Sequence, residues 1–128
     1  MAKTGEVSRL TYSGVIFRIE FYVRPSGEAL AEEWLESQSA SMQAKFAALF
    51  TWLGDQGRIS NERKFKHLTD SNQIFELKAD DERILCFFFS GQRVILTHGF
   101  RNKRNKTPKS EIERAERLKR EFETRTQR

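Results

Sequence analysis

A run of apolar residues in the second half of the chain most constrains the fold. The segment RILCFFFS, residues 83–90, is apolar at every position from Ile84 to Phe89, so a strand formed here would bury both of its faces. After the turn residues 90–92 (SGQ), the segment RVILTHGF at 93–100 resumes an apolar strand pattern, which is typical of a β-hairpin. These residues predict a central strand and its hairpin partner.

Two other segments alternate between apolar and polar residues. VIFRIEFYV at 15–23 and QIFELKA at 73–79 both have the period of two that predicts a strand with one buried face. Residues 58–72 between the predicted helices and the second strand are polar, and we expect a loop there.

Three segments have helical patterns. PSGEALAEEWLES at 25–37 predicts a short helix, and a second helix is expected to start at Ser39 or Ser41 and to stop at Gly54 or Gly57. Thr107 is a candidate N-cap for a last helix whose first residue is Pro108. The second helix carries an apolar stripe at spacings of three and four, formed by Met42, Phe46, Leu49, Phe50 and Leu53.

The predicted order of elements is β-α-α-β-β-β-α. We therefore expect a single α+β domain with an antiparallel sheet of about four strands, an N-terminal α-hairpin and a C-terminal helix. A chain of 128 residues is long enough for one domain with a substantial core, and eleven phenylalanines supply much of it.

The positive charge is concentrated at the C-terminal end. Residues 1–100 contain 12 basic and 13 acidic side chains, whereas residues 101–128 contain 11 basic and 5 acidic ones. A basic excess on one element is expected of a nucleic-acid-binding protein or of a protein with an acidic partner.

The sequence has no signal of a membrane protein, a secreted protein or a metal- or cofactor-binding protein. No apolar run reaches the roughly 18 residues that a membrane span needs, and the first ten residues do not resemble a secretory signal. The single cysteine, Cys86, lies in an apolar strand, where a buried structural thiol is expected, and we predict a cytoplasmic protein. His67 and His98 are 31 residues apart with no cluster of Cys, Asp or Glu at ligand spacing, and no phosphate-binding glycine motif is present, so no metal or cofactor is predicted.

The segment FELKADDERILCFFFSGQRVILTHGFRNKRNKTPKSEIERA, from the second alternating strand into the last helix, carries a family resemblance. Together with the order of elements, it resembles the RelE/HigB family of bacterial toxins, most closely the HigB-like, phage Gp49-like branch. The resemblance covers roughly residues 15–122. It implies that residues 1–128 form a single RelE/HigB-like toxin domain.

Such toxins are endoribonucleases (mRNA interferases) that cut mRNA in the ribosomal A site without a metal, and an antitoxin, often a helix-turn-helix protein, neutralises them. The resemblance therefore implies mRNA, the ribosome and an antitoxin as partners, and no membrane. Two alternatives remain open: a ParE-like gyrase inhibitor that does not cleave RNA, and a basic RNA-binding module that has lost the chemistry.

Metal-free RNA cleavage requires a base at the 2′-hydroxyl, cations at the phosphate and a proton for the leaving 5′-oxygen. The resemblance places Arg83 at a position that contacts the scissile phosphate, with a strand-edge surface arginine as the alternative. Lys78 matches a cation of the preceding strand, although Glu76 stands where several relatives carry another lysine. A surface role for Lys78 is the alternative.

The histidines and the arginine after the last strand complete the candidate catalytic residues. His98 is either a proton shuttle at the end of its strand or a core histidine, and His67 is either a catalytic or positioning residue or a surface histidine. Arg101 matches a second phosphate-contacting arginine. Some RelE members carry a tyrosine shortly after it, and this chain has Thr107 and Pro108 there instead.

Five further cations are predicted to bind RNA phosphates. Cations at a strand end and at the N-terminus of a helix form an anion site, because the free N–H groups of the helix point to the same place. The predicted RNA-binding residues are Lys64, Lys66, Lys103, Arg104 and Lys106.

Overall fold

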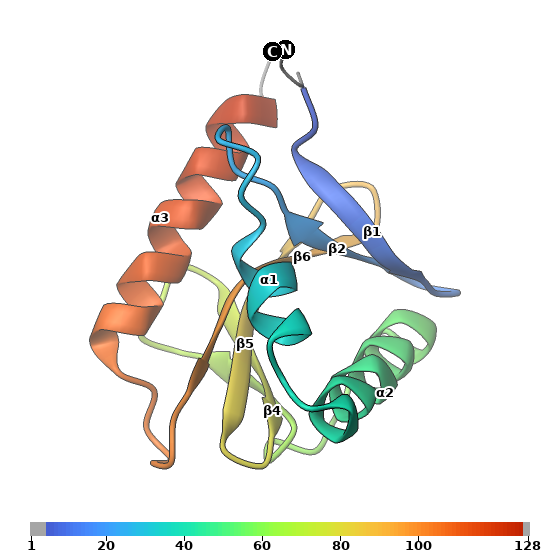
Figure 1. The fold of residues 1–128 in the computed structure, drawn as a ribbon, viewed down its shortest axis with the longest axis vertical. Helices are drawn as coiled ribbons and strands as arrows, with labels where there is room; N and C mark the ends of the chain where they lie inside the picture. The colour runs from blue at the N-terminus through green and yellow to red at the C-terminus, as the bar shows by residue number, and fades with distance from the viewer. Residues whose placement is uncertain (1–4, 127–128) are drawn as a thin grey trace.

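The computed structural model describes residues 5–126, which form one six-stranded sheet with helices on both of its faces (Figure 1). This confirms a single α+β domain. The elements are β1 (Ser8–Ser13), β2 (Arg18–Tyr22), α1 (Leu30–Glu36), α2 (Ala40–Gln56), β3 (Phe65–Leu68), β4 (Ile74–Ala79), β5 (Glu82–Phe89), β6 (Arg93–Arg101) and α3 (Lys109–Thr126).

The sheet has the strand order β1-β2-β6-β5-β4-β3, which places β5 and β6 at its centre. Leu85 and Phe87 of β5 pack under α3, whereas Ile84 and Cys86 of the same strand pack with residues of α1 and α2. The prediction of a central strand buried on both faces is therefore confirmed. Burial also raises the pKa of the Cys86 thiol, which keeps it protonated and inert.

The predicted sheet was wrong in two respects. It has six strands rather than about four, because β1 precedes the predicted first strand and β3 forms within the segment 58–72 that was predicted to be a loop. The sheet is also mixed, since β2 pairs with β6 in parallel while the other neighbouring strands are antiparallel. A parallel pair needs a long crossover, and everything from α1 to β5 provides it.

The two N-terminal helices are confirmed with shifted ends. The first begins at Leu30 rather than near Pro25, because residues 24–27 form a turn in which Gly27 N–H donates to Arg24 C=O. Ser39 is the N-cap of α2, and its side chain accepts a hydrogen bond from Met42 N–H. Gly57, at φ 79°, ends this helix in the left-handed conformation.

Gly54, the other candidate stop, lies inside α2 and has a packing role. A Cβ atom placed on Gly14 would lie only 2.3 Å from the backbone of Gly54, so the turn between β1 and β2 touches the helix backbone directly. The N–H groups of Ile16 and Phe17 both donate to the Gly54 carbonyl, which fixes the end of α2 on this turn.

The C-terminal helix α3 covers the other face of the sheet. Its residues Ala115, Leu118 and Phe122 are buried there, in a second core cluster with Leu85 and Phe87. The connection from β6 to the start of α3 therefore crosses the end of the sheet on this face, next to the polar ends of β4 and β5.

Candidate active site

A polar row crosses the α3 face of the sheet near the first turn of α3. Residues directly opposite one another on neighbouring strands share a face. Four residues are such partners across β3, β4, β5 and β6, namely Lys66, Glu76, Leu85 and His98 in that order. Lys78 and Arg83 form the next pair along β4 and β5. We name Lys66, Glu76, Lys78, Arg83, His98 and Thr107 the α3-face site.

A buried carboxylate and guanidinium lie at the centre of this site. Glu76 is fully buried and Arg83 is 5% exposed, which rules out the strand-edge surface alternative for Arg83. Arg83 Nε lies 3.8 Å from Glu76 Oε2, and the Thr107 hydroxyl donates to the same oxygen at 2.7 Å. The Thr107 side chain thus reaches back to the sheet from the residues just before α3.

Backbone carbonyls hold the rest of the Arg83 guanidinium. Its Nη1 donates to the carbonyl oxygens of Asp80 at 2.8 Å and of Glu82 at 3.1 Å, and its Nη2 donates to that of Arg104 at 3.4 Å. Arg83 therefore links β5 to the residues 102–107 that follow β6. Its contacts are internal, so its predicted role at a scissile phosphate stays a prediction.

Two atoms of this network have no hydrogen-bond partner within residues 5–126, namely Glu76 Oε1 and Arg83 Nε. Buried polar atoms are nearly always paired, because leaving one unpaired costs about 1–3 kcal/mol. Proteins retain such an energetic cost mainly at functional sites, where a reactive group has to remain accessible to the substrate. Within the described residues Glu76 Oε1 accepts no hydrogen bond, and it is buried, which suits it to take a proton from a hydroxyl group.

A pocket of about 310 Å³ lies beside the network. Thr107 separates it from Glu76, and Lys66 and Lys106 line it with their charged side chains. Asp70 is the acidic residue of its lining. The pocket brings together two of the five predicted RNA-binding cations at the start of α3, on the face of the sheet that carries Glu76.

Lys78 lies close to this pair, half-buried at the end of β4. Burial lowers the pKa of its ammonium group, the carboxylate of Glu76 opposes this, and the cations Lys66 and Arg83 lower the pKa further. A lysine with a lowered pKa gives up its proton more readily than an ordinary lysine. This environment favours the catalytic role predicted for Lys78, which stays a prediction.

His98 is buried, with 1% of its surface exposed, as the core alternative required. Its Nε2 lies 2.9 Å from Glu111 Oε1 and its Nδ1 lies 3.1 Å from Thr97 Oγ1. Burial lowers the pKa of the imidazole, and Arg114 and Arg117 act in the same direction against the attraction of Glu111. In the neutral ring, Nε2–H donates to Glu111 because a carboxylate only accepts. His98 therefore ties β6 to the first turn of α3.

Replacing His98 with glutamine is expected to flatten the acid side of the stability curve. A lowered pKa in the folded state means that the unfolded chain binds more protons, so wild-type stability falls as the pH drops through the ordinary histidine value of 6.5. One such group contributes at most about 1.4 kcal/mol per pH unit. Urea unfolding from pH 7.5 to 5.5 should show a smaller loss of stability for His98→Gln than for wild type.

His67→Gln, at an exposed histidine stacked on Phe75, is the control for this measurement. It removes a histidine but leaves the contact of His98 with Glu111 in place. If the free energy of unfolding of wild type and of His98→Gln changed equally with pH, the folded state would accept the protonated imidazole of His98 as readily as the unfolded chain does.

The remaining predicted residues do not join the α3-face site. Arg101 lies opposite Glu82 in the sheet, and Glu82 precedes Arg83 by one residue, so Arg101 faces the side opposite to Arg83. Its guanidinium binds Glu82 Oε2 at 2.5 Å and Asp81 Oδ2 at 3.5 Å. His67 also lies on the opposite face. Its ring stacks on Phe75, with centroids 4.7 Å apart. Lys64, Lys103 and Arg104 are exposed.

Sequence reasoning missed the central position of Glu76. It treated this residue as a departure from the lysine of several relatives, and it treated Thr107 as a helix cap. The available signal was the alternation of β4, which puts Glu76 on the same face as Ile74 and Lys78. Burial by α3 and by the residues before it could not be seen in that pattern.

Among residues 5–126, no group of three or more His, Cys, Asp or Glu side chains is arranged to hold a metal ion. No helix in the same range is long and apolar enough to cross a membrane.

Comparison with known proteins identifies one family. The model of the family described as phage-derived protein Gp49-like (DUF891) matches residues 33–120, which include all elements from most of α1 to the middle of α3. No curated protein matches the chain. The assignment to the HigB-like branch stays a prediction. This protein belongs to the Gp49-like family of toxins from toxin–antitoxin systems, which are related to RelE and HigB, and this membership implies an antitoxin as its partner.

Proposed function

We propose that this protein is a metal-independent, ribosome-dependent endoribonuclease that cleaves mRNA in the A site. The observation that carries the proposal is the buried Glu76 carboxylate, which has one oxygen without a hydrogen-bond partner in the described chain and lies beside Arg83 and a pocket flanked by Lys66 and Lys106. A gyrase inhibitor that leaves RNA intact needs no such base.

The chemistry follows from the positions of these groups. Glu76 Oε1 accepts the proton of a 2′-hydroxyl, and the 2′-oxygen attacks the adjacent phosphorus. Lys66, Lys106 and Arg83 stabilise the charge that grows on the phosphate oxygens. The bond from phosphorus to the 5′-oxygen breaks, and Lys78 donates a proton to that oxygen. The products are a 2′,3′-cyclic phosphate and a 5′-hydroxyl, with Glu76 protonated and Lys78 neutral until solvent exchanges the proton.

The closed geometry of the site supports dependence on a partner. Glu76 is fully buried beneath Thr107, so an RNA phosphate reaches it only after the residues 102–107 move away. His98 and Glu111 hold the first turn of α3 in place until then. A ribosome that opens this segment as it positions mRNA would activate the protein, and an antitoxin, of the helix-turn-helix kind that the RelE/HigB resemblance implies, would keep it closed. Both events belong to the cytoplasm.

The decisive experiment is a translating extract programmed with a defined mRNA and supplied with purified protein. Primer extension maps new 5′ ends, and a parallel tube contains the same RNA without ribosomes. We expect cuts at A-site codons in the first tube alone. The downstream fragments should accept label from polynucleotide kinase without prior dephosphorylation, because their ends carry a 5′-hydroxyl.

Uncut mRNA in a tube whose translation is nevertheless arrested would refute the nuclease. Growth arrest accompanied by inhibition of gyrase supercoiling would support the ParE-like alternative. RNA binding without arrest or cleavage would support the non-catalytic alternative.

A further inference from the structure

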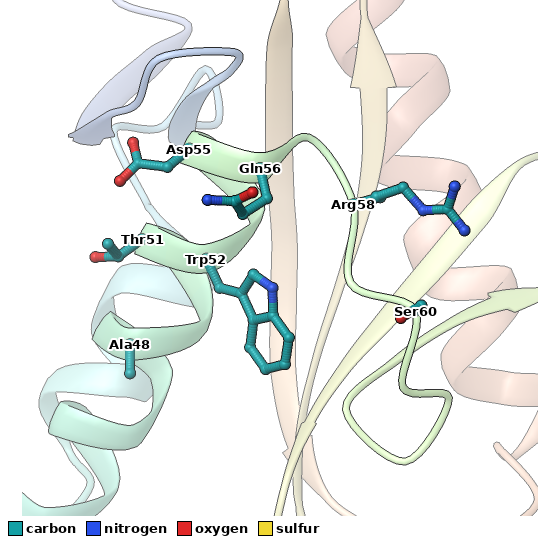
Figure 2. Close-up of a pocket in the computed structure, with 7 residues that line it drawn as sticks. All are labelled: Ala48, Thr51, Trp52, Asp55, Gln56, Arg58 and Ser60. Atoms are coloured by element: carbon teal, nitrogen blue, oxygen red, sulfur yellow. The ribbon is translucent and has the colours of Figure 1, made fainter.

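The largest aromatic side chain exposed on α2 lies among cations. Trp52 is 39% exposed. Figure 2 shows its indole projecting from α2 toward the segment that carries Arg58 and Ser60. Trp52 lines two neighbouring hollows of about 690 and 640 Å³, which also share Ala48. We name this surface the Trp52 groove and define it by Trp52 and five cations: Lys45, Arg58, Arg63, Lys64 and Lys78.

The positive charge of this groove is largely free for a ligand. Of its two acidic lining residues, Asp80 is paired with Lys45 at 2.6 Å, and Asp55 accepts hydrogen bonds from the Tyr12 hydroxyl and Val15 N–H. Arg58, Arg63 and Lys64 are exposed, and none has a carboxylate within 4.0 Å in residues 5–126. Glu62 is the acidic side chain of the segment 58–64, and it interacts electrostatically with Lys78.

This combination of groups fits single-stranded nucleic acid better than another polyanion. Proteins bind single strands with a positively charged groove for the backbone and an aromatic side chain on which a base stacks. An acidic peptide would use the cations but has no planar base for the indole face. A duplex has its bases stacked on one another, so it would use the cations alone. The exposed indole is therefore the feature that selects the ligand.

We propose that the Trp52 groove binds single-stranded RNA, with a base stacked on Trp52 and phosphates on Arg58, Arg63 and Lys64. Lys78 connects this groove to the proposed active site, because it lines the groove and interacts electrostatically with Glu76. Binding in the groove does not depend on cleavage, so it stands or falls separately from the proposed function.

Fluorescence anisotropy of a labelled 12-nucleotide 2′-O-methyl oligouridylate tests this proposal with the full chain. The probe cannot be cleaved, because its 2′-oxygens are blocked. Trp52→Ala is expected to raise the Kd about 5- to 150-fold, the loss typical of a stacked base. Trp52→Phe should stay within about threefold of wild type, because a phenyl ring still stacks. Leu10→Ala, at another exposed apolar residue, should leave the Kd unchanged.

A second pair of variants tests the phosphate contacts. The double change Arg63→Gln with Lys64→Gln should reduce the dependence of log Kd on log salt by about 1.4, since each lost contact with a single strand removes about 0.7. Arg120→Gln, at an exposed cation of α3, should leave the slope unchanged. Circular dichroism and thermal unfolding establish that each variant is folded.

Three results would refute the binding of single-stranded RNA in the Trp52 groove. They are an unchanged Kd for folded Trp52→Ala, binding of an RNA duplex as tight as that of the single strand, and displacement of the RNA by a 12-residue polyglutamate at equal concentration. Wild type that binds the probe through Trp52 but never cuts mRNA would refute the nuclease and retain the groove.

Discussion

Glu76→Gln is expected to reduce the rate of ribosome-dependent mRNA cleavage by about 10²- to 10⁴-fold, the usual contribution of a general base. Glutamine keeps the shape of the side chain and an oxygen for the Thr107 hydroxyl, but its amide cannot take the proton of a 2′-hydroxyl. The rate is measured by single-turnover cleavage of mRNA on programmed ribosomes. In cells, the same change should relieve growth arrest.

The matched control is Glu113→Gln, at an exposed glutamate of α3 on the same side of the molecule. It should cleave at the wild-type rate. Glu76→Gln also leaves Arg83 without its carboxylate, so thermal unfolding must show that the variant is folded at the assay temperature. A folded Glu76→Gln protein that cleaves within threefold of wild type would exclude Glu76 as the base.

The elements predicted well from the sequence are those with strong periodic patterns. The apolar run of β5, the stripe of α2 and the Pro-initiated α3 each bury a wide face, so hydrophobic spacing was sufficient to locate them. The strands β1 and β3 escaped prediction because both lie at the edges of the sheet. β3 has only four residues, and residues of β1 are half-buried or exposed, which leaves little hydrophobic signal.

The hairpin of β5 and β6 was predicted from local patterns, but the pairing of β2 could not be. One neighbour of β2 is β6, which is far away in the sequence and runs parallel to it. That choice depends on the crossover of the intervening chain over one face of the sheet. Nothing in the alternation of residues 15–23 distinguishes a parallel partner from an antiparallel one.

Local patterns likewise predicted only some residues of the candidate site. Lys66 and Lys106 were expected in the basic patch, and they do meet at one pocket. Arg101 and His67 lie on the opposite face, and one-residue alternation already separates Arg101 from Phe100 and His67 from Lys66. Burial of Glu76 depends on how α3 and the preceding residues close over the sheet, which is a tertiary effect.

Arg83→Met is expected to lower the free energy of unfolding by about 3–5 kcal/mol, the usual cost of removing one partner of a buried ion pair. The change leaves the Glu76 carboxylate without its guanidinium at a fully buried position. It also removes the donors to three backbone carbonyls. Urea unfolding at pH 7.5 measures the difference, and Arg120→Met, at an exposed position, should change stability by less than about 0.5 kcal/mol.

The double variant with both Glu76→Met and Arg83→Met tests why the pair is kept. Replacing both members of a buried ion pair by apolar residues is often neutral or stabilising, so the double variant should regain most of the stability lost by Arg83→Met. It should remain inactive in mRNA cleavage. A double variant less stable than Arg83→Met would instead show that the pair stabilises the fold. A stable, inactive double variant would show that this protein keeps a costly buried charge pair for its chemistry, since an apolar core would fold as well without it.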